Sequence, residues 1–218
     1  MLPELPDEII LHILSFADAK TAVQTSVMNK RCRYLWAFLP VINLDDSSFQ
    51  DAMSFEVFID NFLSCRDTST NVFNVNVDCH NVLYNDLVVD SIIDHVTDTP
   101  SITTTIDVLT ILACCDVSNL PKLSVCTSLT TLKLSYISSE ITNFDLPSLN
   151  HLYLYGCEFV CESESPFDLF KGCVNLESLY LVLSMFSAEL EDKFSPFTRM
   201  QTFDLICGTF SSSAMPQE

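Results

Sequence analysis

The sequence is poor in charged residues and poorest in basic ones. Only 18% of the 218 residues are charged, and 10 lysines and arginines stand against 29 aspartates and glutamates, for a net charge of −19. Residues 1–40 hold four acids and four bases, so the whole negative balance falls on residues 41–218. An acidic surface repels phosphate backbones, which argues against nucleic acid as a partner of that region. A basic partner is compatible with this charge, although solubility explains it equally well.

Long apolar runs are also missing. A membrane-spanning helix needs about 18–20 consecutive apolar residues, and the best candidate, Ile106–Cys115, is too short and contains Asp107. The chain starts with Glu4, Asp7 and Glu8 where a signal peptide would be basic. We therefore expect a protein of the cytoplasm or nucleus with no membrane partner. Because 48% of the residues are hydrophobic, a substantial buried core is expected.

Metal-binding and catalytic patterns are absent from the sequence as well. The ten cysteines include no C-x-x-C pair, and the four histidines show no ligand spacing with them. We interpret the cysteines as free thiols that act as small buried apolar side chains. No G-x-S-x-G, P-loop or H-E-x-x-H sequence occurs. The sequence therefore predicts no enzyme activity, no catalytic residues, no metal site and no cofactor.

Three short apolar segments precede Pro40. The first is predicted to be a helix with Pro6 in its first turn, where Asp7 and Glu8 favour the helix dipole. Further helices are expected over about 21–28 and 30–38, and Pro40 ends the last one. Three helices this short cannot bury their apolar surface among themselves. With no metal or disulfide predicted, a partner or the rest of the chain must cover the surplus.

The pattern changes after Pro40 and becomes repetitive. Apolar stripes predict helices over 55–63 and 89–96, and a strand is expected over 72–77. Four later segments, which start at Cys126, Leu146, Cys173 and Phe197, share apolar residues at their positions 1, 4, 7 and 9. Their starts lie 20, 27 and 24 residues apart, which is typical of leucine-rich repeats. Each copy predicts one strand whose leucines face the next coil. Residues 72–77 and 106–108 are candidate earlier copies, and a short helix is predicted over 166–171 before a glycine.

Residues 5–45 resemble the F-box of plant F-box/leucine-rich-repeat proteins. Three blocks stand in the family's order, at Leu5–Glu8, Ala22–Val27 and Arg33–Trp36. The repeats resemble the same family in the phrases at 146–154 and 172–181. Departures from the family pattern are Cys32 in place of the usual tryptophan, Gln24 in place of a base, and residues 17–19 in place of a Leu-Pro turn. FBD-type relatives often continue into a C-terminal FBD region, which we expect these 218 residues to lack.

Repeat pattern and resemblance together imply an α/β chain. The expected domains are a three-helix F-box at 1–42, a linking strand and amphipathic helix at 43–68, leucine-rich repeats at 69–210 and a polar tail at 211–218. The repeats would form an irregular solenoid, with parallel strands on the concave face and short helices and loops on the convex face. The implied function is a substrate-recruiting subunit of a Skp–cullin–F-box ubiquitin ligase. Its implied partners are a Skp-type adaptor, a cullin bound through that adaptor, and an unknown protein target. Two alternatives remain open: a decoy that binds the adaptor without promoting ubiquitination, and a repeat scaffold with a vestigial F-box.

Two sets of interface residues follow. Those expected to bind the adaptor are apolar residues of the first and third helices: Leu5, Pro6, Ile9, Ile10, Ile13, Leu14 and Trp36. We expect the set to divide between contact residues, led by Leu5 and Pro6, and the module's own core. Those expected to bind the target lie at outward strand positions between the repeat leucines: Lys133, Tyr153, Tyr155, Tyr180 and Asp204. Tyrosine is enriched at interface hot spots but also suits exposed strands, so both interpretations stay open.

Overall fold

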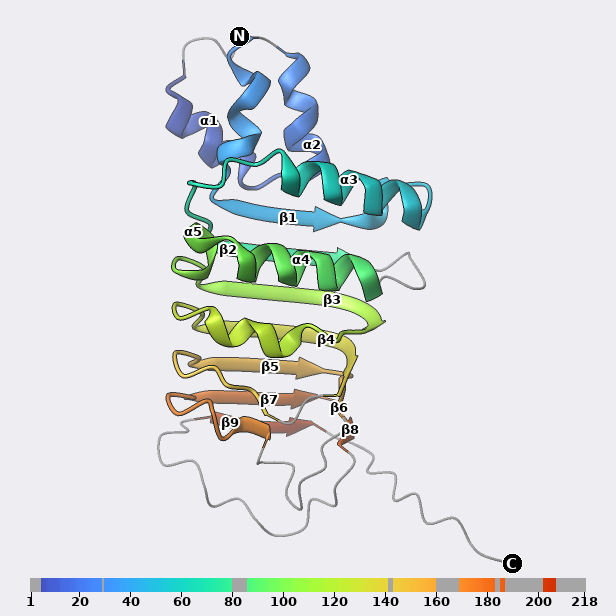
Figure 1. Cartoon of the computed structure of the whole chain (residues 1–218), viewed down its shortest axis with the longest axis vertical. Helices are drawn as coiled ribbons and strands as arrows, with labels where there is room; N and C mark the ends of the chain where they lie inside the picture. The colour runs from blue at the N-terminus through green and yellow to red at the C-terminus, as the bar shows by residue number, and fades with distance from the viewer. Residues whose placement is uncertain are drawn as a thin grey trace, which may run out of the picture.

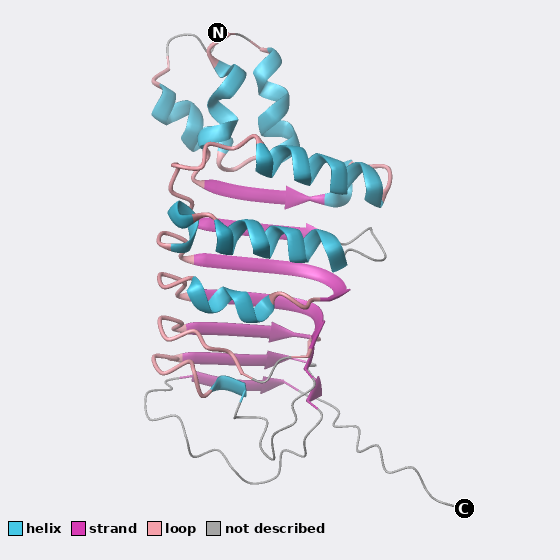
Figure 2. Ribbon diagram, viewed as in Figure 1, coloured by secondary structure: helices cyan, strands magenta, loops and turns pink. Residues whose placement is uncertain are grey.

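The computed structural model describes residues 5–28, 30–79, 86–140, 143–159, 169–182, 185–186 and 202–206. A helical N-terminal module is joined to a stack of parallel strands, and the helices that connect the strands lie on one face of the stack (Figure 1). The chain is therefore of a mixed helix and sheet class, as predicted (Figure 2). In the part of the chain that the structure describes, no helix has the length and apolar character needed to cross a bilayer.

The N-terminal module contains four short helical elements. They are α1 (Asp7–Leu14), α2 (Ala19–Gln24) and two 3-10 helices, η1 (Thr25–Val27) and η2 (Cys32–Phe38). Pro6 is the N-cap of α1 and so lies one position before the predicted first turn. The predicted helix over 21–28 starts earlier, because the Asp18 carboxylate caps α2 and accepts a hydrogen bond from the Thr21 amide at 2.9 Å. It also ends at Gln24, where the chain tightens into η1.

Seven strands run parallel in the order in which the chain forms them. They are β1 (Val41–Asp45), β2 (Asn74–Cys79), β3 (Val108–Asp116), β4 (Thr131–Ser139), β5 (His151–Tyr155), β7 (Ser178–Val182) and β9 (Thr202–Ile206). Two short strands extend the sheet at one end: β6 (Glu158–Phe159) pairs with the last two residues of β4, and β8 (Met185–Phe186) pairs with β6. We call the seven parallel strands the strand stack.

The connections between the first strands are helical, because parallel neighbours need a crossover on one face. The connection from β1 to β2 contains η3 (Asp46–Ser48) and α3 (Ala52–Ser64). The connection from β2 to β3 contains α4 (Asp86–Asp98) and α5 (Pro100–Thr103), and the connection from β3 to β4 contains η4 (Leu120–Val125). The helices predicted over 55–63 and 89–96 are thus present, within α3 and α4. The short helix predicted over 166–171 begins outside the described residues. Phe197 and Met200 of the fourth repeat copy, and the polar tail, also lie outside them.

The register aligns equivalent apolar side chains on successive strands. One row consists of Ile42, Val75, Leu109, Leu132, Leu152 and Leu179, and each is at most 1% exposed. Because side chains alternate along a strand, this row faces the connecting helices and belongs to one core that extends from β1 to β7. The strand expected in the linking segment, β1, is therefore paired into the stack.

An aromatic and cationic cluster joins the module to the stack. Trp36 packs against the cores of both parts, and its ring stacks on Phe62 of α3 with centroids 5.5 Å apart. The Arg66 side chain, only 5% exposed, donates a hydrogen bond to the Leu39 carbonyl at 2.6 Å and lies over the Phe62 ring. Burial lowers the pKa of Arg66 to about 10, which leaves the guanidinium charged at neutral pH.

A second contact fixes the same junction on the other side of β1. The Asn43 side-chain amide donates hydrogen bonds to the Ser15 and Ala17 carbonyls, at 2.9 and 3.1 Å. The Asn76 amide donates in turn to the Asn43 side-chain oxygen at 2.8 Å. These bonds tie the turn between α1 and α2 to the first two strands, so the module has a fixed orientation on the stack.

Gly172 offers a stability test of the close approach between two loops. A Cβ added there would meet the Phe144 carbonyl oxygen and would lie 2.7 Å from the Asp145 Cα, both backbone atoms. Because the backbone must shift to relieve this overlap, we expect Gly172→Ala to lower the free energy of unfolding by about 1–3 kcal/mol in urea denaturation. Val174→Ala is the control, because this nearby side chain is 64% exposed. It should change the free energy of unfolding by less than about 0.5 kcal/mol. Equal stability of the two variants would contradict the packing.

The thiols provide a test of the core. Six of the eight described cysteines are buried, and none of the eight forms a disulfide bond. Burial raises the pKa of Cys126 and Cys157 to about 11 and that of Cys173 to about 12, so they carry almost no reactive thiolate near neutrality. We expect iodoacetamide at about pH 8 to modify the exposed Cys65 and Cys114 first, with the three buried thiols protected until denaturant is added. Peptide mass mapping checks this, and rapid native modification of Cys157 would contradict it.

Candidate protein interfaces

The predicted adaptor-binding residues of α1 divide between core and surface. Ile10 and Leu14 are 4% and 7% exposed and belong to the core of the module itself. Ile9 and Ile13 lie one turn apart on another side of α1 and are 45% and 50% exposed. The structure therefore gives Ile10 and Leu14 a role in folding and leaves Ile9 and Ile13 accessible to a partner.

The remaining three members of that set are placed differently from one another. Pro6 is exposed at the start of α1, and Leu5 is half-buried against the module core. Trp36 is half-buried at the junction with the stack, where its indole Nε1 donates to the Arg33 carbonyl at 3.2 Å. Its stacking on Phe62 makes Trp36 a structural link between the two parts, which helix periodicity alone does not indicate.

Other exposed apolar side chains of the module did not belong to the predicted set. Phe16, Val27, Met28 and Tyr34 are 78%, 86%, 58% and 65% exposed. The position of Phe16 could have been inferred from sequence, because it follows Ile9 and Ile13 at helical spacing. The exposure of Val27 and Tyr34 could not be inferred in this way, because it depends on how η1 and η2 pack. Exposed apolar side chains in such number on so small a module are typical of a protein interface.

The face of the stack opposite the connecting helices carries the predicted target-binding residues; we call it the uncovered face. Lys133, Tyr153 and Tyr180 are level on three neighbouring strands. The two tyrosine rings stack with centroids 4.6 Å apart, and the Lys133 Nζ lies 5.2 Å from the Tyr153 centroid. Asp204 is level with Tyr180 on β9, and its side chain lies outside the described residues. The structure thus brings Lys133, Tyr153 and Tyr180 into one row.

Tyr155 lies in the next row and has a partner that the sequence did not reveal. Its ring contacts Tyr136 edge to face at 5.1 Å, and a hydrogen bond between the two side chains raises the pKa of Tyr136. Tyr136 has a φ of 60°, unusual for a residue other than glycine. Gly156, also at φ 60°, allows this arrangement, since a Cβ there would lie 2.7 Å from the Tyr136 ring. The register irregularity between Leu112 and Cys115 that accompanies this bend has no signature in the repeat pattern.

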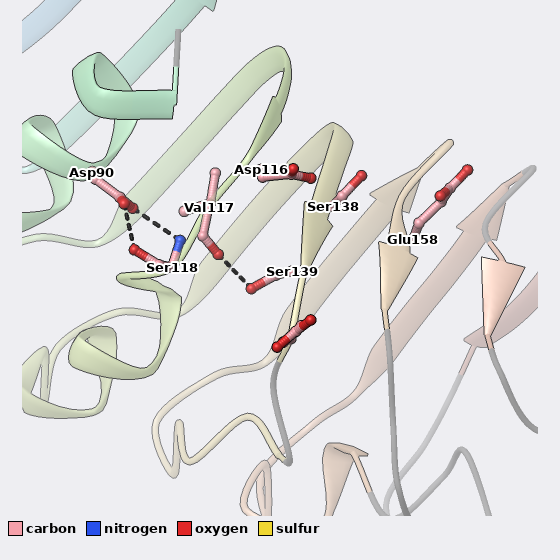
Figure 3. A pocket seen from close by; sticks show the side chains of 8 residues that line it. Asp90, Asp116, Val117, Ser118, Ser138, Ser139 and Glu158 are labelled. Atoms are coloured by element: carbon pink, nitrogen blue, oxygen red, sulfur yellow. Dashed lines mark hydrogen bonds between the residues drawn. The ribbon is translucent and has the colours of Figure 1, made fainter. Parts of the chain in front are cut away.

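A cavity of about 570 Å³ lies where the chain leaves β3 and β4. Asp116, Ser138 and Glu158 are level on β3, β4 and β6 and project from the three strand ends (Figure 3). Across the cavity, Asp90 of α4 accepts hydrogen bonds from the Ser118 amide and hydroxyl at 3.1 and 2.5 Å. Glu140 also lines the cavity, and none of its described lining residues is basic. Over the residues that the structure describes, no group of three or more metal-ligating side chains is present.

Comparison with known proteins points to one family at the N-terminus. Residues 2–42 match the F-box domain. The chain is 28% identical over 197 residues to an Arabidopsis thaliana F-box protein, covering 83% of this chain and 45% of that protein. An F-box/LRR-repeat protein of the same plant is 41% identical over 76 residues, which are 32% of this chain and 20% of that protein. A putative F-box/FBD/LRR-repeat protein is 35% identical over 77 residues, 35% and 17% of the two chains.

The chain spans less than half the length of the relatives it matches. No solved structure matches it.

Proposed function

Since the chain carries an N-terminal F-box domain and is related to the plant F-box family, we propose that it is a substrate-recruiting subunit of a Skp–cullin–F-box ubiquitin ligase. The observation that carries this proposal is the F-box match over residues 2–42, on a module whose α1 leaves Ile9 and Ile13 accessible. In this role the chain is an adaptor for a target and contributes no catalytic group. It would act in the cytoplasm or nucleus.

The module is the proposed docking site for a Skp-type adaptor. Ile9 and Ile13 on α1 are 45% and 50% exposed, and Phe16, two residues after the end of α1, is 78% exposed. Each such side chain contributes about 1.5–3 kcal/mol when a partner buries it fully. Leu5 and Pro6, at the start of α1, extend the same proposed contact. The core residues Ile10 and Leu14 support it indirectly, by holding α1 in place.

The strand stack is the proposed target-binding part, built as an irregular leucine-rich-repeat solenoid. The level apolar row from Ile42 to Leu179 supports this assignment, because each repeat buries its apolar face only against its neighbours. Two of the relatives carry LRR-repeat in their names. The uncovered face, with Lys133, Tyr153, Tyr155 and Tyr180, would hold the target.

The mechanism is proximity. An adaptor on the module and a target on the stack would be held at a fixed separation, because Trp36, Arg66 and Asn43 fix the junction between the two parts. The cullin, bound through the adaptor, would bring the activated ubiquitin to the target. A high effective concentration then accelerates transfer without any chemistry by this chain.

A reconstituted ligase tests the recruiting role. The full chain would be assembled with a plant Skp-type adaptor and a cullin, and proteins that co-purify with it would be incubated with the ubiquitin-transfer enzymes. We expect at least one co-purifying protein to be ubiquitinated only when the chain is present. A chain that binds the adaptor while no captured protein is ever modified would be a decoy, and the recruiting role would be wrong.

A further inference from the structure

Acidic side chains line one end of the uncovered face. Asp45 on β1, Asp78 on β2, Asp116 on β3 and Glu158 on β6 all stand at outward positions near the carboxyl ends of their strands. Among the described residues of all the strands of the sheet, Lys133 of β4 is the only lysine or arginine. Like charges along one edge sum to a negative potential that attracts cationic groups from solution.

This acidic edge continues into the cavity at the ends of β3 and β4. Asp116 and Glu158 line it together with Asp90 (Figure 3), and Glu140 is a further lining residue. Two of the described bases outside the module are engaged elsewhere: Lys122 forms an ion pair with Asp94 at 2.6 Å among the connecting helices, and Arg66 is buried at the junction. The cavity has a volume of about 570 Å³, which is room for side chains that come from another molecule.

Exposed tyrosines stand near these acids on neighbouring strands. Tyr136 lies two residues before Ser138 on β4, and Tyr155 ends β5 three residues before Glu158 of β6. The two tyrosines are 44% and 38% exposed. The face of a tyrosine ring attracts ammonium and guanidinium groups, as the Lys133 Nζ over Tyr153 already illustrates within this chain. The carboxylates therefore attract cations by their charge, and the tyrosine rings attract the same cations by their faces while also offering apolar contact area.

We propose that this end of the uncovered face docks a segment of the target protein that is rich in lysine and arginine. The proposal rests on the recruiting function given above and adds to it the chemical class of the target. Charge complementarity selects the occupant: acidic partners and nucleic acids would be repelled by Asp116, Glu140 and Glu158, whereas lysine and arginine side chains match both the acids and the exposed rings.

The test uses a labelled peptide of about twelve residues, half of them lysine or arginine and the rest glycine or serine, with a glutamate-containing peptide as its counterpart. Fluorescence anisotropy is recorded with the full chain bound to its adaptor, at low and at high salt. We expect the basic peptide to bind, with an affinity that falls as salt rises, and the acidic peptide not to bind. If the basic peptide does not bind at low salt, the proposal is wrong.

Matched triple variants locate the site. Asp116→Asn with Glu140→Gln and Glu158→Gln should weaken basic-peptide binding at least about 10-fold, by removal of three attractive charges. Glu56→Gln with Asp60→Asn and Asp98→Asn removes the same charge from α3 and α4 and should change it less than about 3-fold. Tyr155→Ala should weaken binding about 5-fold. Equal losses in both triple variants would show a response to net charge alone and would overturn the proposal.

Two controls separate this proposal from the recruiting function. Adaptor co-purification should be unchanged in the acidic-edge triple variant and in Tyr155→Ala, because these residues lie at the ends of β3 and β4 and on β5 and β6, away from the module. An adaptor that fails to bind even the wild-type chain would defeat the recruiting function. Thermal melting confirms that each variant folds. A dimer of the chain that the acidic-edge triple variant dissociates would assign this face to a second copy and would overturn the proposed occupant.

Discussion

Replacement of Ile9 and Ile13 by aspartate should weaken binding of a Skp-type adaptor at least about 100-fold. The two side chains are 45% and 50% exposed on α1, and burial in an adaptor would contribute about 1.5–3 kcal/mol each. Their loss alone is worth roughly 3–6 kcal/mol, and every 1.4 kcal/mol is a factor of ten in the dissociation constant. Two carboxylates moved into an apolar contact add a desolvation cost. Isothermal titration calorimetry with purified adaptor measures the change.

A matched variant on α3 separates this loss from a general effect of added charge. Met53 and Val57 have the same spacing of four residues and are 72% and 54% exposed. Met53→Asp with Val57→Asp should leave the dissociation constant for the adaptor within about 2-fold. Because Ile9 and Ile13 lie outside the module core, the thermal midpoints of both double variants should remain close to that of the wild type. An Ile9/Ile13 variant that binds normally would remove α1 from the adaptor interface.

Phe62→Ala should lower the free energy of unfolding by about 3–5 kcal/mol, the usual loss for truncation of a buried phenylalanine. Phe62 is 2% exposed and stacks on Trp36 and Phe58 at 5.5 and 5.7 Å. The Arg66 guanidinium also lies over its ring. Removal of the ring leaves a cavity where the module meets the stack, so stability and the fixed orientation of the module are lost together. Urea denaturation measures the first.

Hydrogen exchange measures the second effect of Phe62→Ala. Amides of η2 should exchange faster in the variant than in the wild type, since Trp36 loses its packing partner on α3. Phe62→Leu refills most of the space and should recover more than half of the lost stability, whereas Val57→Ala, at an exposed site of the same helix, should cost less than about 0.5 kcal/mol. A loss below about 1 kcal/mol for Phe62→Ala would contradict the junction described.

Periodicity predicted the parts of this fold that depend on local sequence. Leucines at fixed spacing, such as Leu132 and Leu152, indicated strands that bury the same face, and the register places them level on β4 and β5. The stripe from Phe55 to Leu63 indicated α3. The order of three short sequence motifs near the N-terminus indicated the F-box, and residues 2–42 match that domain. In each case the signal lies within a few residues of the element it specifies.

Features that depend on contacts distant in sequence were not predictable in this way. Trp36 looks like a surface anchor in sequence, and only its stacking on Phe62, 26 residues later, shows that it joins the two parts. The sequence around Tyr136 does not indicate its positive φ, which Gly156, directly after β5, permits. The acidic cavity likewise depends on register, because Asp116, Ser138 and Glu158 come from three strands. Helix ends shifted where Asp18 supplied a cap that periodicity does not report.

Titration of the wild-type chain with a purified plant Skp-type adaptor tests the central claim most directly. Isothermal titration calorimetry should give saturable binding near one adaptor per chain, with a dissociation constant of about 1 µM or tighter, since several exposed apolar side chains of the module become buried. The Ile9/Ile13 double variant should show no saturation over the same range. Absence of binding by the wild-type chain at about 100 µM adaptor would contradict the account.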